Sequence, residues 1–455
     1  MSKKKENFWQ ENRETVKTAA AMAWPSVLES FFISLAGMID SLMVSSIGAY
    51  AVAAVGLTTQ PKFLGLALFI AQNVAVSAIV ARRKGQDNKE GANQTLMTAA
   101  LFTVIAGILV SVFCVVFADP IVRLCGSASD THDGAVIYFR IIMGGMIFNI
   151  ISLVINAAQR GAGNTKIAMK TNVTSNVVNM IGNYLLIGGN LGFPALGITG
   201  AAIATVFGTV VACVMSIHSI MKPGNFVSLP FMIKNKLRIS MAPVKNIIKI
   251  GSSVFTEQIL MRLGFMSVAI MAAKLGTEAF AAHQVGMNLL NLSFSFGDGM
   301  QVAAVALIGQ SLGEKKPEMA KLYGRICQRM GFIISVVLAA VYLLGGRMLY
   351  RLFFEEEPII EMGVVILRLL VVIVMIQISQ VIYAGCLRGA GDVIYTMLSS
   401  TFSVTIVRII ASYTFCYGLG FGLPGIWIGI LCDQGCRLLL MRHRFKSGVW
   451  TKVKI

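Results

Sequence analysis

Gln-Arg-Gly-Ala-Gly-Asn at residues 159–164 returns as Leu-Arg-Gly-Ala-Gly-Asp at residues 387–392, an offset of 228 residues from Arg160 to Arg388. The same offset relates many other positions without a gap, which chance similarity would not maintain. The sequence is therefore a tandem repeat of one structural plan. Further pairs at this offset are Glu29 with Glu257, Gly48 with Gly276, Arg123 with Arg351, and Arg140 with Arg368.

The composition places this chain in a membrane. Of its 455 residues, 56% are hydrophobic and only 13% are charged, whereas about a quarter are charged in an average soluble domain. Apolar stretches of about 20 residues or more, which is the length that crosses the hydrocarbon core as a helix, recur between short polar breaks. We expect an all-α membrane protein with about twelve transmembrane helices, at residues 18–46, 51–81, 94–118, 135–159, 167–190, 198–221, 246–274, 279–309, 324–346, 362–387, 393–418 and 424–440.

The repeat and the spans together predict two lobes of six helices each. We place the N-terminal lobe at residues 1–221, a cytoplasmic linker at 222–245, and the C-terminal lobe with its basic tail at 246–455. Because six is an even number, both copies insert with the same orientation, and a pseudo-two-fold axis along the membrane normal should relate them. Two such lobes can rock about a central site, so the pattern is typical of a secondary transporter that works by alternating access.

The net charge of +18 follows the rule that cytoplasmic loops of membrane proteins are positive. Lys and Arg gather at residues 3–5, 82–84, 222–245, 315–316 and 442–454, which fall on one side if the helices alternate. We therefore expect a multi-pass plasma-membrane protein with both termini cytoplasmic. Nucleic-acid binding would need a continuous basic surface, for which this chain has too little polar area. The eight cysteines form no C-x-x-C pair, so we expect reduced thiols and no cofactor.

Ionisable residues inside the spans are candidates for function, because a charge in lipid is costly unless it faces a cavity or a partner. Glu29, Asp40 and Glu257 are the carboxylates, and they could bind a proton or Na⁺ on one side of the membrane and release it on the other. The structural alternative is an ion pair, for instance Glu257 with Arg262. Lys62 and Arg408 also lie within spans, and the sequence does not assign their partners.

Polar side chains form stripes on two predicted helices, and these are candidates for a substrate cleft. Helical spacing places four amides on one face of the fifth span, and a second stripe follows the eighth span. Hydrogen bonds between helices are the structural alternative for such stripes. The stripes comprise Asn172, Asn176, Asn179 and Asn183 in the fifth span and Gln284, Asn288, Asn291, Ser295 and Asp298 in the eighth. The cleft candidates are Glu29, Asn149, Asn172, Asn176, His283, Gln284, Asn288, Asn291, Asp298 and Gln377.

The motif set resembles the multidrug and toxic compound extrusion (MATE) transporters over essentially the whole chain. The residues that carry the resemblance are Glu-Ser-Phe-Phe from Glu29, Met-Ile-Asp-Ser-Leu-Met-Val around Asp40, Ala-Ala-His-Gln at 281–284, Gly309 to Gly313, and the two Arg-Gly-Ala-Gly segments. The resemblance implies that Asp40 is the aspartate of a cation site, with Asn179, Asn183 and Thr199 as its companions, and that Glu257 is the corresponding acid of the other lobe. Asn183 and Gln377 stand where the family often has aspartates.

The resemblance implies an efflux antiporter that exchanges H⁺ or Na⁺ for small organic compounds, often cations. Na⁺ would bind at Asp40, and beyond the membrane lipid we expect a monomer without further partners. One alternative is a flippase or exporter of a lipid-linked or narrowly specific natural substrate. An enzyme would need convergent catalytic groups, whereas the four histidines are scattered, at His132, His218, His283 and His443.

Overall fold

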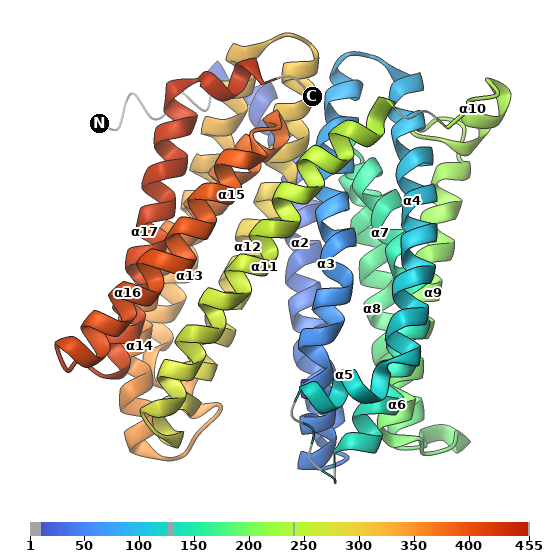
Figure 1. Ribbon diagram of the computed structural model, residues 1–455. Helices are drawn as coiled ribbons and strands as arrows, with labels where there is room; N and C mark the ends of the chain where they lie inside the picture. Colours follow the sequence, from blue (N-terminus) through green and yellow to red (C-terminus); the bar gives the residue numbers. More distant parts are fainter. Residues whose placement is uncertain (1–10, 126, 128, 130, 240–241, 454–455) are drawn as a thin grey trace. The chain divides into compact units, whose positions relative to one another are not determined.

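The computed structural model describes residues 11–125, 127, 129, 131–239 and 242–453 (Figure 1). Contacts between residues divide the chain into two units. Phe31–Ser252 form what we call the N-terminal unit, and Met1–Ser30 with Ser253–Ile455 form what we call the C-terminal unit. Both units are built from helices, which is the class that the apolar stretches predict.

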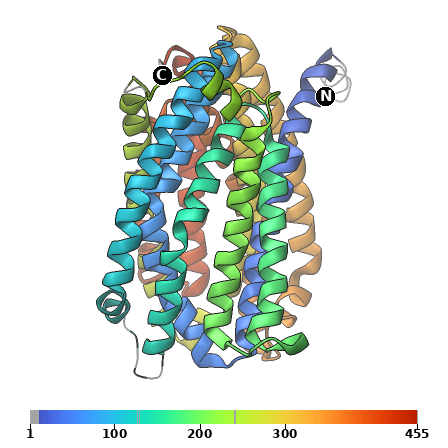
Figure 2. The ribbon, with the colours of Figure 1, turned by 90° about the vertical axis from the view of Figure 1, so that its right-hand side faces the viewer.

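The helices of the N-terminal unit run side by side along one direction (Figure 2). The bent pair α6 and α7 changes direction by 44° at the break between Gly144 and Met146, and the two helices are long and apolar enough to cross a membrane when taken together. The short helices α5 and α10 lie outside the candidate spans. The elements are the later part of α2 (Arg13–Ser45), α3 (Ala49–Gly85), α4 (Lys89–Val116), α5 (Ala118–Leu124), α6 (His132–Gly144), α7 (Met146–Gly161), α8 (Thr165–Ile187), α9 (Gly197–Met221) and α10 (Leu229–Lys234).

The C-terminal unit repeats this plan, with one irregular helix. Two π-helical segments, η2 and η3, interrupt the helix that begins at Val393, and π-helical turns are rare and often mark functional positions. The elements are the first part of α2, most of α11 (Ala242–Lys274), α12 (Thr277–Gly313), α13 (Pro317–Arg351), α14 (Glu357–Ala390), α15 (Val393–Thr401), η2 (Phe402–Val407), α16 (Arg408–Tyr413), η3 (Thr414–Gly418) and α17 (Leu423–Ser447).

The helices account for the twelve expected spans. Among the described residues, ten helices are long and apolar enough to cross a membrane, and the pair α6 and α7 adds an eleventh. The twelfth is α8, whose 23 residues reach about 34 Å at 1.5 Å per residue, enough to span the hydrocarbon core. Its asparagines lower its hydropathy, which is why length rather than apolarity identifies it. The predicted all-α class is confirmed, and the described residues contain at least ten helices able to cross a membrane.

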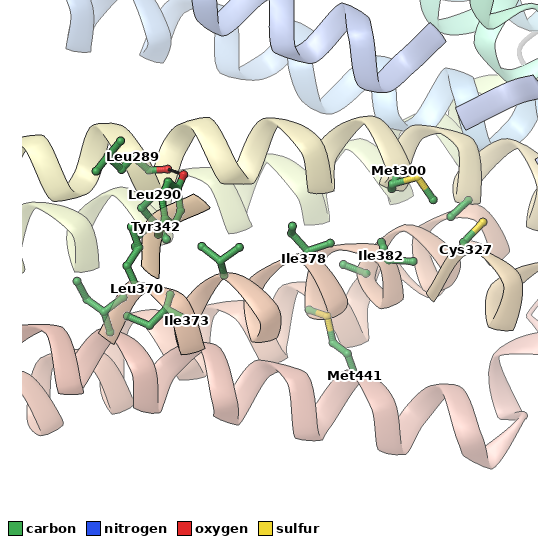
Figure 3. Close-up of a cluster of buried hydrophobic side chains, with 14 of the residues drawn as sticks. Leu289, Leu290, Met300, Cys327, Tyr342, Leu370, Ile373, Ile378, Ile382 and Met441 are labelled. Atoms are coloured by element: carbon green, nitrogen blue, oxygen red, sulfur yellow. Dashed lines mark hydrogen bonds between the residues drawn. The ribbon is translucent and has the colours of Figure 1, made fainter. Parts of the chain in front are cut away.

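A close-packed apolar core holds the C-terminal unit together (Figure 3). Side chains of α12, α13, α14 and α17 interlock in it, and the Tyr342 hydroxyl lies 2.6 Å from that of Ser293 and donates to the carbonyl oxygen of Leu289 at 2.9 Å. The buried tyrosine therefore keeps its polar atom satisfied inside an apolar layer. The labelled residues are Leu289, Leu290, Met300, Cys327, Tyr342, Leu370, Ile373, Ile378, Ile382 and Met441.

The repeated Arg-Gly-Ala-Gly motif ends α7 and α14, and its glycines explain why it recurs. A Cβ atom on Gly161 would lie 2.5 Å from the carbonyl oxygen of Ser77 in α3, and one on Gly389 would lie 2.6 Å from that of Val305 in α12. Ser77 and Val305 are themselves related by the repeat offset. The second glycine of the motif in α14, Gly391, has φ +87°, which terminates the helix in the left-handed region.

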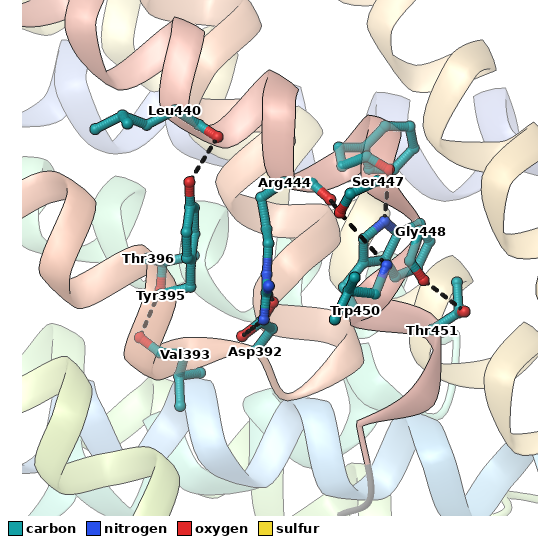
Figure 4. Close-up of polar contacts among 12 residues, drawn as sticks. Asp392, Val393, Tyr395, Thr396, Leu440, Arg444, Ser447, Gly448, Trp450 and Thr451 are labelled. Carbon is teal, nitrogen blue, oxygen red and sulfur yellow. Dashed lines mark hydrogen bonds and ion pairs between the residues drawn. The ribbon is translucent and has the colours of Figure 1, made fainter.

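Polar contacts join the start of α15 to the end of α17 (Figure 4). Arg444 donates from Nε to Asp392 at 2.7 Å, and its guanidinium lies 4.9 Å from the ring centre of Tyr395. The Tyr395 hydroxyl donates to the carbonyl oxygen of Leu440 at 3.0 Å. Trp450 is fully buried and donates its indole N–H to the carbonyl oxygen of Phe445 at 2.8 Å. The basic end of α17 is therefore an ordered part of the C-terminal unit.

Candidate functional site

Asp40 lies in the N-terminal unit with its carboxylate facing amide groups of α8. Asn183 donates from Nδ2 to Asp40 Oδ1 at 2.8 Å. Amide orientations are assigned from their hydrogen-bond partners. The orientation that satisfies both ends of Asn179 has its nitrogen 2.8 and 2.9 Å from the two Asp40 oxygens and its oxygen 3.1 Å from the Thr205 hydroxyl on α9. The site thus joins α2, α8 and α9.

The Asp40 carboxylate opens onto a cavity of about 370 Å³ inside the N-terminal unit. Lys62 of α3 and Tyr138 of α6 reach the same cavity, and Lys62 is close enough to Asp40 for their charges to attract. Lys62 and Thr205 also line a second cavity of about 100 Å³, where Asn149 is found. The two cavities therefore meet at Lys62 and Thr205.

Amide donors contact Asp40 directly, and hydroxyl groups of Ser41, Thr59, Tyr138 and Thr205 line the same cavity. Amide N–H groups of Asn179 and Asn183 point at the carboxylate, and the nearest charged group in the cavity is the Lys62 ammonium. A hard cation needs a shell of oxygen ligands instead. Among the residues that the structure describes, no group of three or more His, Cys, Asp or Glu side chains could hold a metal ion. Hydrogen bonds from the two amides stabilise the ionised form of the Asp40 carboxylate.

Thr205, and not Thr199, supplies the α9 hydroxyl of this site. Ala201 and Thr205 are one helical turn apart and line the cavity together. Thr199 precedes Ala201 by two residues, which turns it about 200° around the helix to the other side. Spacing along α9 shows that Thr199 and Thr205 lie on different faces, but it does not show which of these faces meets α2 and α8.

Glu257 forms an ion pair in the C-terminal unit. Arg388 of the repeated motif donates from Nη2 to both Glu257 oxygens at 2.9 Å, and both side chains are nearly inaccessible to solvent. The sequence suggested Arg262 as the structural partner, and the structure gives Arg388 instead. The reason is that Arg388 comes from the end of α14, a neighbour that spacing along α11 cannot reveal.

A second buried charge cluster in the C-terminal unit explains Arg408. Arg408 of α16 donates to Asp433 of α17 from Nε at 3.1 Å and from Nη2 at 2.6 Å, and Arg437 donates to the same oxygen at 2.9 Å. Asp433 is fully buried and Arg408 is 1% exposed. Two guanidinium groups therefore share one carboxylate. The sequence contained a sign of this cluster, because the opposite charges at 433 and 437 lie one helical turn apart in an apolar span.

The other predicted cleft residues are spread over several environments. Asn172 and Asn176 are half-buried on α8, whereas Gln284, Asn288 and Asn291 form an exposed stripe on α12. Asp298 accepts a hydrogen bond of 3.5 Å from Ser30 within the C-terminal unit. His283 is buried, with its ring centre 5.7 Å from that of Trp427. Glu29, Ser295 and Gln377 are buried as well.

The chain repeats one bundle of membrane helices, and its N-terminal unit encloses a cavity that a carboxylate faces. These features define the class of polytopic membrane transport proteins. The MatE family model matches it twice, over residues 25–185 and 254–414. The chain therefore belongs to the MATE family of transporters. The two matched segments also agree with the internal repeat.

The relatives of the chain cover nearly its whole length. It is 25% identical over 451 residues to "Probable multidrug resistance protein NorM" of Thermotoga maritima, covering 96% of this chain and 94% of the relative. It is 24% identical to "Uncharacterized transporter YisQ" of Bacillus subtilis, covering 94% of each. A solved structure described as an outward-facing multidrug resistance MATE family transporter aligns with a TM-score of 0.88 at 23% identity, covering 95% of this chain and 96% of that one.

Proposed function

We propose that this protein exports small organic compounds across the plasma membrane in exchange for protons, and that Asp40 is the group that binds the proton. The observation that carries the proposal is the Asp40 carboxylate, which is surrounded by amide donors and opens onto a cavity of about 370 Å³. A transmembrane carboxylate in contact with a cavity is the typical position of a coupling group. The names of the multidrug relatives support the class of substrate.

The exchange follows from the charge of Asp40. An ionised Asp40 attracts the positive group of a bound compound, and two unit charges about 4 Å apart attract by about 4 kcal/mol at an intermediate dielectric. A proton on either carboxylate oxygen removes most of this attraction and so weakens binding by roughly a thousandfold. Protons arriving from outside therefore release the compound, and loss of the proton to the cytoplasm restores the site.

The remaining predicted residues take supporting roles in this proposal. Asn149, which lines a cavity together with Lys62, and the α8 asparagines contact the compound within the N-terminal unit. The exposed amides Gln284, Asn288 and Asn291 on α12 are the candidate contacts of the C-terminal unit. Glu257, held by Arg388, fixes the end of α14 against α11 rather than carrying the coupling ion. Both termini lie in the cytoplasm, in line with the basic loops.

The test is uptake of a fluorescent organic cation into inverted membrane vesicles under an imposed proton gradient or an imposed Na⁺ gradient. We expect uptake with the proton gradient, no uptake with Na⁺ alone, and loss of uptake in Asp40→Asn, because the amide cannot take up and release a proton. The matched control is Asp87→Asn, an exposed acid between α3 and α4 whose positive φ suits asparagine.

Two outcomes would contradict the proposal. Uptake driven by Na⁺ alone would mean that the site collects oxygen ligands in another conformation, and proton-driven uptake that persists in Asp40→Asn would move the coupling group elsewhere. Absence of uptake under both gradients, with normal membrane insertion, would favour a lipid-linked or narrowly specific natural substrate.

A further inference from the structure

A cavity lies between the end of α13 and the first part of α14 in the C-terminal unit. It encloses about 340 Å³, and its lining comes from residues 342–347 of α13 and residues 364–368 of α14. The connection between these two helices is at the lower end of the unit in Figure 1. Gly346 departs from helical geometry, with φ 11° and ψ −103°, so α13 bends at the wall of this cavity.

The charged side chains in the lining are both arginines, Arg347 and Arg368. Arg347 shares the carboxylate of Glu357 with Arg351, which donates from Nη2 to Oε1 at 3.2 Å. Among the described residues, no acid pairs with Arg368. The cavity is therefore positive and lacks its own countercharge. Three further acids at this end of the unit are exposed and lie outside the lining: Glu355, Glu356 and Glu361.

Arg368 lies too deep along α14 to be an ordinary surface arginine. It follows Glu357, the first residue of α14, by eleven positions, or about 16 Å of helix, and it lies inside the apolar stretch that begins at residue 362. A charge at this depth is costly unless it reaches a partner or the headgroup layer. Helical side chains lean toward the N-terminus of their helix, which for α14 is the end nearer the membrane surface, so the Arg368 stem can carry its guanidinium toward the headgroups.

The rest of the lining is largely apolar. Leu343 and Leu344 form its α13 side, and Val364 and Leu367 form its α14 side. Leu343 is 65% exposed and Leu344 is 87% exposed, so both side chains are available to fatty acyl chains. The cavity thus joins two guanidinium groups to an apolar wall, and the molecule that complements both has an anionic head and a hydrocarbon tail.

We propose that this cavity binds an anionic phospholipid, with the lipid phosphate at Arg347 and Arg368 and an acyl chain along Leu343 and Leu344. Guanidinium groups match the geometry of phosphate and hold it through paired, charge-assisted hydrogen bonds. The phosphate gives Arg368 the countercharge that the protein does not supply. The bound lipid then joins α13 to α14 beside the bend at Gly346.

The internal repeat distinguishes the two units at this position. The offset of 228 residues relates Arg368 to Arg140, which is also exposed, but it relates Arg347 to Asp119. Asp119 pairs with Arg123 at 3.0 Å, and its carboxylate repels a phosphate where Arg347 attracts one. Leu344 corresponds to Val116 in α4, which is 62% exposed. Val116 is therefore a matched control position in the N-terminal unit.

The test measures tryptophan fluorescence of the full-length protein in lipid vesicles, with Leu344→Trp as the reporter and lipids brominated on their acyl chains as quenchers. The signal of the parent protein, which has four tryptophans, is subtracted. Brominated phosphatidylglycerol diluted in phosphatidylcholine, and the reverse mixture, give the relative affinity of the two lipids beside residue 344. We expect a preference for phosphatidylglycerol of about fivefold or more, which is the contribution of one arginine near an anionic lipid. Arg368→Gln in the reporter protein should lower this preference by about fivefold.

Three controls accompany the reporter. Val116→Trp should be quenched equally by both lipids, and Arg140→Gln combined with Leu344→Trp should keep the full preference. Arg368→Lys keeps the charge and should retain the preference, which guards against misfolding of the glutamine variant.

Four results would overturn the inference. They are equal quenching of Leu344→Trp by both lipids, the same preference at Val116→Trp, an unchanged preference in Arg368→Gln, and loss of the preference when inorganic phosphate is added at constant ionic strength. The third would show that Arg368 does not hold the lipid, and the last would show that the cavity takes a free anion instead of a lipid.

Discussion

At the scale of single residues, the C-terminal unit shows how a membrane helix accommodates charge. Arg408 lies between two π-helical segments, and its guanidinium is also stacked 4.6 Å from the ring centre of Phe265. Asp433 accepts from Arg408 and Arg437 through one oxygen, Oδ2. The cluster joins α16 to α17 where the helix between 393 and 418 is least regular, so its first role is to hold that helix in place.

Asp433→Asn should destabilise the protein strongly. The substitution keeps the size of the side chain but leaves two buried guanidinium groups without a countercharge, and loss of one partner of a buried ion pair costs about 3–5 kcal/mol. Thermal unfolding in detergent should show a clearly lower midpoint than for the wild type.

The comparison variant for Asp433→Asn is Glu361→Gln, which changes an exposed acid of α14 and should unfold like the wild type. An unchanged midpoint in Asp433→Asn would mean that the two arginines have other partners.

Part of the Asp40 site was expected from the sequence. Asp40 was singled out as a carboxylate in lipid, and the resemblance to MATE transporters implied Asn183 as its companion, which does donate to it. Thr205 and Lys62 were not assigned, because helical periodicity gives the relative faces of residues on one helix but not which neighbouring helix each face meets. The Glu257 partner was missed for the same reason, since Arg388 is brought there by the packing of α14 against the rest of the unit.

At the scale of elements, small residues decide which helices touch. The Arg-Gly-Ala-Gly motif brings the last turn of α14 onto the backbone of α12, and the equivalent glycine does the same for α7 on α3. Each copy of this motif therefore makes one close contact between two helices, which the sequence alone does not reveal.

Gly389→Ala should lower stability by about 1–3 kcal/mol, because the new Cβ would overlap backbone atoms of Val305 that no rotamer change can move. Gly435→Ala in α17 is the matched control. Its Cβ would meet nothing within 4 Å, and alanine is favoured over glycine inside a helix by about 0.5–1 kcal/mol.

Chemical or thermal unfolding of Gly389→Ala and Gly435→Ala should therefore shift in opposite directions. A stabilised Gly389→Ala would show that α12 and α14 separate more easily than their contact indicates.

The helix boundaries agree with the expected spans to within a few residues at most ends. The largest extensions are in α13, which runs Pro317–Arg351 against an expected 324–346, and α17, which runs Leu423–Ser447 against 424–440. Both helices continue into basic segments, where the sequence is no longer apolar but the backbone is still helical. The break between α6 and α7 and the π-helical segments were not foreseen, because both lie within continuous apolar sequence.

At the scale of the whole molecule, the basic residues should set the orientation in the membrane. A fusion of green fluorescent protein to the C-terminus should be fluorescent, and a fusion of alkaline phosphatase at the same place should be inactive, because the cytoplasm suits the first reporter and not the second. Reporters placed after Lys234, in the basic loop, should give the same answer as the terminus. An active phosphatase at either place would reverse the predicted orientation.

The glycine contacts also determine where each unit can bend. Helices that touch through backbone atoms do not slide past each other. We therefore expect two helix pairs to move as rigid bodies during transport: α3 with α7, and α12 with α14. Flexing is then left to the interrupted helices, which are the 44° joint between α6 and α7 and the π-helical turns on either side of Arg408. The repeated motif therefore fixes not only how the units are built but also which joints are available as hinges.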